Sequence, residues 1–253
     1  MFENDVLLCE FSQYHVCLGR ADANSKKIKG LSYYELRNLL EPEKLHDILK
    51  AEEATPQNKI IWSSAFRNVV LMPTQQFTEE GARQIFSATY GTHENALFFN
   101  EVPSYNLMLV HALPQGLMEV LKSSGSGGIM HVYSCVLQAN TSGNQLSVQF
   151  TGKEVQVLAI KEGQLQLAQT YLYTAPLDVV YYLLSICQQY DFLQADVELV
   201  VSGLISEDSA MYKELYQYFS NIHFWKPASK AHLQSEHPPH FFSSMYNLAS
   251  CAL

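Results

Sequence analysis

The sequence predicts an α/β protein made of two halves in which one order of strands and helices occurs twice. Runs of alternating apolar and polar residues mark the strands, whereas apolar residues three and four positions apart mark the helices. The order strand, strand, strand, helix, strand, helix, strand runs from residue 6 and starts again at residue 145. This repetition is the most informative property of the chain.

The first half opens with three strands and a helix. The β-rich runs Val6–Phe11 and Tyr14–Leu18 are joined by a short polar turn, and a third run spans Ile28–Leu36. Such closely spaced runs predict an antiparallel meander. Pro42, a residue favoured at the first helical position, predicts a helix that continues to Ala54.

The rest of the first half alternates strands and helices. Thr78 is a suitable N-cap for the second helix, whose first turn is acidic. The glycine-rich segment of residues 123–128 has no Gly-Lys-Ser/Thr ending, so it is interpreted as a plain loop and not as a phosphate-binding one. The expected elements are strands at Ile60–Ala65 and Asn68–Met72, a helix at Glu79–Ala88, a hairpin of Ala96–Glu101 with Leu107–Ala112, and a helix at Pro114–Lys122.

The second half repeats the pattern from Gln145. The expected elements are strands at Gln145–Phe150, Glu154–Ile160 and Gln164–Tyr173, a helix at Pro176–Tyr190, a strand at Val197–Val201, a helix at Asp208–Phe219 and a strand at Ile222–Trp225. We therefore expect two domains, residues 1–140 and 141–253.

Local residues agree with a duplication. When the second half is aligned so that position 9 falls on position 148, Cys9-Glu10-Phe11-Ser12 matches Val148-Gln149-Phe150-Thr151. The alignment then shifts by one, so that Ser32-Tyr33-Tyr34 falls on Thr170-Tyr171-Leu172. Because alternation alone produces similarity at every second position, the duplication rests on the order of elements more than on these identities.

Composition excludes several classes of function. The chain has 253 residues with 25 acidic and 16 basic side chains, a formal charge of −9. Surfaces that bind nucleic acid or anionic membranes need clustered positive charge, so neither partner is expected. No apolar run approaches the ~20 residues of a membrane-spanning helix, and no basic segment precedes an apolar one near residue 1. We expect a cytoplasmic protein.

The five cysteines are widely spaced and include no Cys-x-x-Cys pair. In a chain of this size they indicate buried, reduced thiols and argue against a disulfide framework or a zinc site. Cys9 and Cys17 could lie close together on adjoining strands, but a functional disulfide there is not favoured.

The repeated unit and several apolar motifs resemble known proteins. The motifs are Gly163-x-Leu165, Asp178–Leu184, Leu199–Ile205 and Leu215–Phe219, with weaker matches at Val70–Pro73 and at His131. The repeated unit resembles the actin-like ATPases, and the motifs are similar to a bacterial family of unknown function, domain of unknown function 3822. That resemblance implies a duplicated actin-like ATPase (ribonuclease H-like) fold. Each half would hold a mixed sheet with a three-strand antiparallel meander and crossover helices.

The same resemblance makes the phosphate-binding turns informative. Active members carry Asp-x-Gly in the first turn of each half, where aspartate organises the metal ion and water, and glycine admits backbone N–H groups to the phosphates. Here the turns contain Glu10-Phe11-Ser12 and Gln149-Phe150-Thr151, and an amide cannot supply charge to magnesium. A glycine pair near the adenosine is reduced to Gly203, with Pro73 at the matching place in the first half.

These losses predict a pseudo-ATPase without cofactor that acts as a protein-interaction or assembly component. The exposed aromatics of the second half and the apolar segment of residues 241–246 are the candidate partner surface. The alternative is a nucleotide-binding protein with little or no hydrolysis, and a third possibility is an enzyme with unrelated chemistry. Nucleotide binding would use a cleft between the halves with Ser12, Thr151, Gly152 and Gly203, beside the degenerate acidic positions Glu10 and Gln149.

A histidine-dense segment near the C-terminus raises the question of a metal site. The spacing of His232, His237 and His240 could direct three ring nitrogens to one ion. Pro238 and Pro239 prevent a helix there, so a solvated loop is favoured and no metal is expected.

Overall fold

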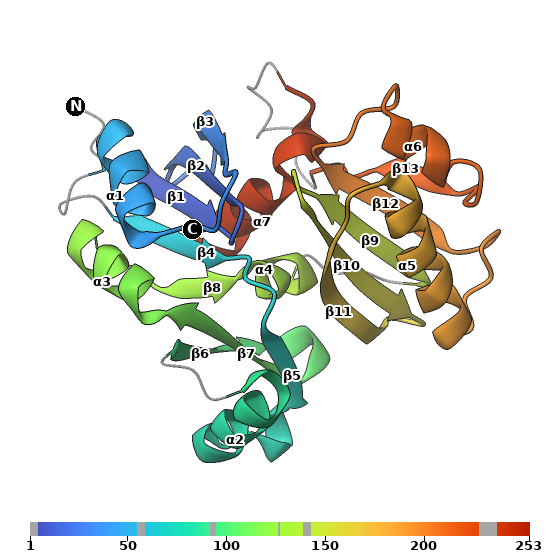
Figure 1. The fold of residues 1–253 in the computed structure, drawn as a ribbon, viewed down its shortest axis with the longest axis horizontal. Helices are drawn as coiled ribbons and strands as arrows, with labels where there is room; N and C mark the ends of the chain where they lie inside the picture. The colour runs from blue at the N-terminus through green and yellow to red at the C-terminus, as the bar shows by residue number, and fades with distance from the viewer. Residues whose placement is uncertain (1–4, 55–58, 92–94, 126, 139–142, 228–236) are drawn as a thin grey trace. The chain divides into compact units, whose positions relative to one another are not determined.

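The computed structural model describes residues 5–54, 59–91, 95–125, 127–138, 143–227 and 237–253. These residues form two compact units (Figure 1). The first unit contains the described residues up to 138 and residues 244–253, and the second contains residues 143–227 and 237–243. The C-terminal helix therefore packs in the first unit, which its position in the chain does not predict.

A five-stranded sheet with the order β3-β2-β1-β4-β8 forms the centre of the first unit. β1 is antiparallel to β2 and parallel to β4, and β4 is parallel to β8. The predicted meander is confirmed, and the parallel strands extend it on one side. The strands are β1 (Asp5–Phe11), β2 (His15–Asp22), β3 (Ile28–Glu35), β4 (Ile60–Ser64) and β8 (Ile129–His131).

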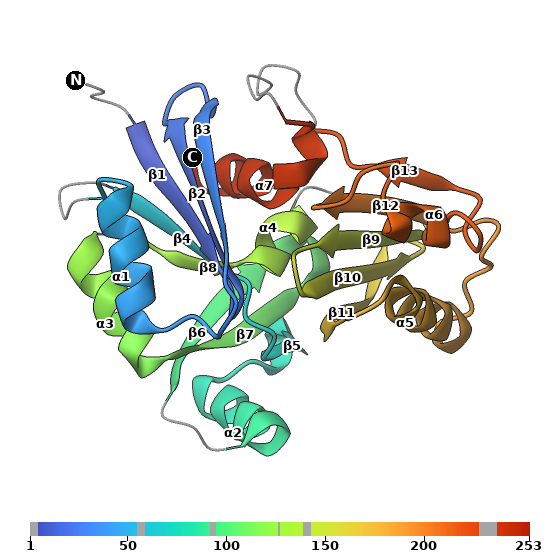
Figure 2. The ribbon, with the colours of Figure 1, turned by 45° about the horizontal axis from the view of Figure 1, so that its top comes forward.

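Helices lie on both faces of this sheet (Figure 2). α1 (Pro42–Ala51) and α3 (Gln115–Ser124) share an apolar core with the face that carries Phe11 and Trp62. α4 (Val132–Gln138) and the part of α7 (Ser243–Ala252) that belongs to this unit lie on the other face. There the Met245 methyl group would be 3.0 Å from a Cβ on Gly19 of β2.

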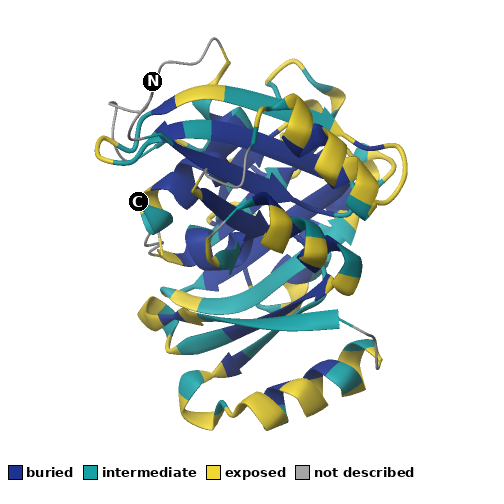
Figure 3. Ribbon diagram, turned by 90° about the vertical axis from the view of Figure 1, so that its left-hand side faces the viewer, coloured by how far each residue is buried: buried dark blue, intermediate teal, exposed yellow. Residues whose placement is uncertain are grey.

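A smaller antiparallel sheet with the order β5-β7-β6 is inserted between β4 and α3. Its elements are β5 (Val69–Pro73), α2 (Glu79–Tyr90), β6 (Asn95–Val102) and β7 (Leu107–Pro114). Thr78 caps α2 by accepting a hydrogen bond from the Gly81 N–H, as predicted. α2 packs on the sheet through Ala82 and Phe86, while much of its outer side is exposed (Figure 3).

The second unit repeats the central sheet with the order β11-β10-β9-β12-β13. α5 (Pro176–Gln189) and α6 (Ala210–Leu215) contribute to one apolar core with it. α6 is shorter than the predicted helix and begins after Ser209, whose hydroxyl accepts from the Tyr212 N–H. The strands are β9 (Gln145–Phe150), β10 (Glu154–Lys161), β11 (Gln164–Leu172), β12 (Glu198–Gly203) and β13 (Ile222–Phe224).

The two central sheets match in register. Leu7 is paired with Ile60 in the first sheet, and Leu146 is paired with Leu199 in the second. Leu146 follows Leu7 in the chain by the same number of residues as Leu199 follows Ile60. A bulge that follows residue 20 of β2 recurs after residue 159 of β10, which is that offset again. The duplicated fold predicted from the order of elements is confirmed.

The third strands correct the predicted alignment. Val16 faces Tyr34 in the first sheet, and the equivalent Val155 faces Tyr171 in the second. Tyr34 is therefore equivalent to Tyr171 and not to Leu172, because the connection from β2 to β3 is longer than the turn from β10 to β11.

The apolar segment near the C-terminus is not the exposed surface predicted from its composition. Phe242, Met245 and Tyr246 are buried. Residues 239–242 form a 3₁₀ turn, and α7 follows directly, so the two prolines precede a helix and do not mark a solvated tail. Within the described ranges, no helix is long and apolar enough to cross a membrane.

Candidate functional site

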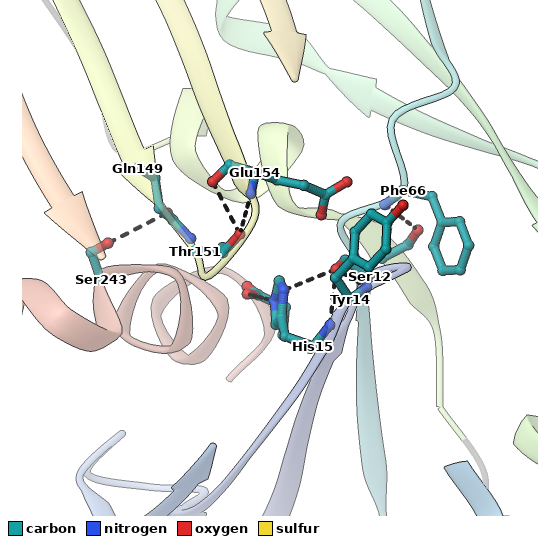
Figure 4. Close-up of polar contacts among 10 residues, drawn as sticks. Ser12, Tyr14, His15, Phe66, Gln149, Thr151, Glu154 and Ser243 are labelled. Atoms are coloured by element: carbon teal, nitrogen blue, oxygen red, sulfur yellow. Dashed lines mark hydrogen bonds and ion pairs between the residues drawn. The ribbon is translucent and has the colours of Figure 1, made fainter. Parts of the chain in front are cut away.

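A chain of three buried side chains closes the β1–β2 turn of the first unit. Ser12 Oγ lies 2.9 Å from His15 Nδ1, and His15 Nε2 lies 3.1 Å from Glu10 Oε1. Ser12 and His15 are drawn in Figure 4. None of these three residues is more than 2% exposed, so solvent does not reach their side chains.

Hydrogen-bond partners fix the proton positions in this chain. Ser12 Oγ accepts from the backbone N–H groups of Tyr14 and His15, at 3.0 and 3.3 Å, which occupies both of its lone pairs. Its own proton is therefore donated to His15 Nδ1, and the Nε2–H of that ring is donated to Glu10. The Ser12 hydroxyl has no donor left for a phosphate.

The second oxygen of the Glu10 carboxyl is also buried. Glu10 Oε2 and Ser63 Oγ, at paired positions on β1 and β4, are both buried without a hydrogen-bond partner among the described residues. On the other side Glu10 pairs with Cys17 of β2. Burial, and secondarily the charge of Glu10, raises the pKa of the Cys17 thiol well above its usual value, so that thiol stays protonated.

The equivalent turn of the second unit is closed by the backbone of Glu154, which takes the place of His15. Thr151 Oγ1 donates to the Glu154 carbonyl at 3.0 Å and accepts from the Glu154 N–H at 3.2 Å (Figure 4). The Thr151 N–H also donates to that carbonyl, at 2.9 Å. Thr151 is buried, whereas Gly152 is exposed. Both turns therefore use their hydroxyl group to hold themselves together.

Gln149 takes the place of Glu10 in the second unit. Its side chain is partly buried, and its Oε1 accepts a hydrogen bond from the Ser243 hydroxyl at 3.4 Å (Figure 4). A neutral amide in this position supplies an acceptor without charge.

Gly203 stands where β12 passes close to the backbone of β9. Its φ is +79°, and a Cβ on it would lie 2.0 Å from the Phe150 carbonyl oxygen. The adjacent Leu204 N–H donates to the same oxygen at 2.9 Å. The close approach of two strands is sufficient to require glycine here.

The register corrects the residue that was matched to Gly203 in the first half. Phe150 is paired with Gly203, and the equivalent Phe11 is paired with Ser64. The matching position is therefore Ser64, whereas Pro73 ends β5 in the inserted sheet.

The structure brings the predicted residues together in two separate groups. Glu10 and Ser12 meet through His15 in the first unit, whereas Thr151 follows Phe150 and Gly203 pairs with it in the second. The sequence prediction missed His15. The available signal was its spacing of three from Ser12, which places it where the next strand begins.

The histidine-rich segment is only partly described. His240 is buried, and its Nε2 lies 2.9 Å from the Ile205 carbonyl oxygen, while His237 stacks on the Phe241 ring. His232 lies outside the described residues. In the part of the chain that the structure describes, no three His, Cys, Asp or Glu side chains gather in a way that could hold a metal ion.

Comparison with known proteins identifies a family and a fold. The sequence model of a family described as a protein of unknown function (DUF3822) matches residues 7–222. No curated protein is significantly similar in sequence.

Solved structures share the fold over nearly the whole chain. A Bacteroides thetaiotaomicron protein with an actin-like ATPase fold and unknown function has a TM-score of 0.81 and 15% identity, covering 98% of this chain and 96% of that one. A PilM-PilN type IV pilus biogenesis complex gives a TM-score of 0.66 at 12% identity, covering 97% and 98%. The ethanolamine utilization protein EutJ from Carboxydothermus hydrogenoformans gives a TM-score of 0.51 at 8% identity, covering 97% of this chain and 89% of that one.

Proposed function

This chain belongs to the family of proteins of unknown function DUF3822, and we propose that it is a cytoplasmic module that binds another protein and does not hydrolyse nucleotides. One observation carries the proposal, a continuous group of apolar and aromatic side chains on the second unit. This group, the tyrosine patch, consists of Tyr171, Leu177, Tyr181 and Tyr182.

The tyrosine patch has two exposed side chains, Leu177 and Tyr181, beside two half-buried tyrosines that stack on each other. Leu177 and Tyr181, one turn apart on α5, are 58% and 69% exposed. Tyr182 stacks on Tyr171 with ring centroids 4.5 Å apart, and its hydroxyl donates to the Leu172 carbonyl at 3.0 Å. Tyr181 meets the edge of the Tyr182 ring at 6.0 Å. Rigid, exposed tyrosines are typical anchors of protein interfaces, because little conformational entropy is lost when a partner covers them.

The patch continues onto the edge of a sheet. Tyr171 and Leu172 end β11, the outer strand of its sheet, and no side chain of this strand is charged. The equivalent outer strand β3 carries Lys29, whose ammonium group lies 2.6 Å from an Asp5 carboxylate oxygen. Charge on an edge strand discourages the addition of further strands, so β3 is protected in a way that β11 is not. The partner that fits is an extended, apolar protein segment that pairs with β11 and covers the patch.

Two further observations support this function. One of the similar structures is a complex of two proteins, PilM and PilN. In addition, phosphoryl transfer requires preorganised donors and a charged group for the metal ion. Here the hydroxyls of Ser12 and Thr151 are engaged within their own turns, and Gln149 is neutral.

We expect ATP and ADP, each at millimolar concentration with and without magnesium, to leave the melting temperature unchanged relative to magnesium alone. A ligand at a concentration equal to its Kd would stabilise the protein by about 0.4 kcal/mol, which differential scanning fluorimetry and calorimetry would detect. A saturable shift that Ser12→Ala or Thr151→Ala removes would instead favour the nucleotide-binding alternative.

We expect Leu177→Ser combined with Tyr181→Ser to weaken partner binding at least tenfold, equivalent to about 1.4 kcal/mol. Quantitative affinity purification from the encoding organism identifies proteins held by the unmodified chain, and titration calorimetry with the purified partner then measures affinity. Tyr216→Ser is the matched control, because Tyr216 is 64% exposed in the same unit but outside the patch. Equal binding by the double variant and the control would contradict the proposal.

A further inference from the structure

Two cysteines that are far apart in the sequence meet between helices of the first unit. Cys135 of α4 is buried, and Cys251 of α7 is partly exposed. The Cys251 thiol donates to the Cys135 carbonyl oxygen at 3.4 Å. Because a carbonyl oxygen lies about 2.4 Å from its own Cα, the Cys251 sulfur is at most about 5.8 Å from the Cys135 Cα. The Cys251 sulfur therefore lies beside residue Cys135, and the two thiols affect each other's pKa.

The two thiols differ in acidity. The hydrogen bond from Cys135, together with the charge of Lys26, lowers the pKa of Cys251 despite its partial burial. Lys26 is held beside it by a 3.0 Å hydrogen bond from its ammonium group to the Ser250 carbonyl. For Cys135, the hydrogen bond with Cys251 and then burial raise the pKa well above the usual value. Cys251 is therefore the better nucleophile and the more accessible sulfur.

The other described cysteines lack this arrangement. Cys9 is paired with Leu18, and Cys17 is paired with Glu10, so the two thiols point to opposite faces of the sheet. A disulfide between them is excluded by this register. Cys187 is buried in the α5 core, and burial raises its pKa to about 11.

We propose that Cys251 and Cys135 form a reversible disulfide, driven by hydroperoxide, that ties α7 to α4. The Cys251 thiolate attacks one peroxide oxygen and the O–O bond breaks, which gives a sulfenic acid and, after protonation of the leaving oxygen, water or an alcohol. The Cys135 sulfur then displaces hydroxide from the Cys251 sulfur, which releases water as the S–S bond forms. The cysteine pair loses two electrons and the peroxide gains two.

The bond would fix the helix that covers one face of the central sheet. α7 contacts that face through Met245 at Gly19, and Lys26 is a polar link from the β2–β3 connection to its end. A crosslink from α7 to α4 closes a long loop of chain and restricts the unfolded state. The oxidised protein is therefore expected to melt at a higher temperature than the reduced protein.

The test is oxidation of the full chain with hydrogen peroxide, followed by peptide mapping without reductant. We expect a crosslinked peptide pair that contains Cys135 and Cys251, has lost two hydrogen atoms and separates on addition of dithiothreitol. Cys187→Ser, the matched control, keeps the crosslink, and Cys251→Ser abolishes it. Cys135→Ser stops at a sulfenic acid on Cys251 that dimedone traps.

Three outcomes would overturn the proposal. They are a Cys251 that peroxide does not modify, a sulfenic acid that persists in the unmodified chain, and a crosslink that joins other cysteines. Because Cys251 is partly exposed, Cys251→Ser is expected to fold, which thermal melting under reducing conditions verifies.

Discussion

Replacing Gly203 with alanine is expected to lower the free energy of unfolding of the second unit by about 4 kcal/mol or more. The new Cβ would lie 2.0 Å from the Phe150 carbonyl oxygen and 2.7 Å from its nitrogen, so two paired strands would have to separate. The φ of +79° adds a further cost of about 1–2 kcal/mol for any residue with a Cβ.

Gly163→Ala is the matched control for this substitution. Gly163 has a similar φ of +75°, but no atom lies within 4 Å of the position of its Cβ. Gly163→Ala should therefore lower the free energy of unfolding only by the conformational cost, about 1–2 kcal/mol. Urea denaturation of both variants measures the difference. Equal losses would mean that the close approach to Phe150 does not explain why residue 203 is glycine.

Gly203 also illustrates what the sequence can and cannot predict about this site. The sequence shows Gly203 directly after a buried strand, and it shows that the second glycine of the expected pair is absent. The distance from residue 203 to the Phe150 backbone is not visible, because it depends on pairing between strands that are far apart in the sequence. A glycine that the resemblance assigns to nucleotide binding thus has a sufficient structural explanation.

The sequence draws attention to the turns Ser12–His15 and Thr151–Glu154, but it does not predict how they close. In both turns the first residue's N–H donates to the carbonyl of the fourth residue at 2.9 Å. The hydroxyl proton is donated to an imidazole side chain in the first turn and to that backbone carbonyl in the second. The residues at the fourth position differ in type, so comparing the two halves residue by residue does not reveal a shared role. The alignment of the two halves already places His15 on Glu154, and the register confirms it, because both residues stand at the start of equivalent strands.

The fold was more predictable than the site, and the exceptions have physical causes. Long strands and helices with regular periodicity lie close to their predicted positions. β8 (Ile129–His131) and α4 (Val132–Gln138) are too short for periodicity to identify. α7 was missed because two prolines precede it and because its small and polar residues give little amphipathic contrast.

Lowering the pH from 7 to 4 is expected to destabilise the first unit by about 3 kcal/mol through His131 alone. Burial lowers the pKa of His131 from 6.5 to about 4. Its ring is held neutral, because Nε2–H donates to the Phe66 carbonyl at 3.0 Å and Nδ1 accepts from the Tyr133 N–H at 3.2 Å. Above pH 6.5 neither the folded nor the unfolded state binds this proton. Between pH 6.5 and 4 the ring is protonated in the unfolded state but not in the folded state, so stability decreases as the pH is lowered. Below the folded-state pKa both states bind the proton, and the loss levels off.

His111 should add to this loss, and a substitution there isolates the contribution of a buried imidazole from that of titrating carboxylates. Burial, and then the neighbouring His131 ring at 5.2 Å, lowers the pKa of His111 well below its usual value. Both ring nitrogens are buried without a hydrogen-bond partner among the described residues.

His111→Leu is therefore expected to stabilise the protein by about 1–2 kcal/mol at pH 7, because it removes an unsatisfied polar group from the core. It should also make the loss between pH 6.5 and 4 smaller, measured by urea denaturation across that range. A variant that is less stable at pH 7 and keeps the full acid sensitivity would show that His111 has a partner that stabilises its ring.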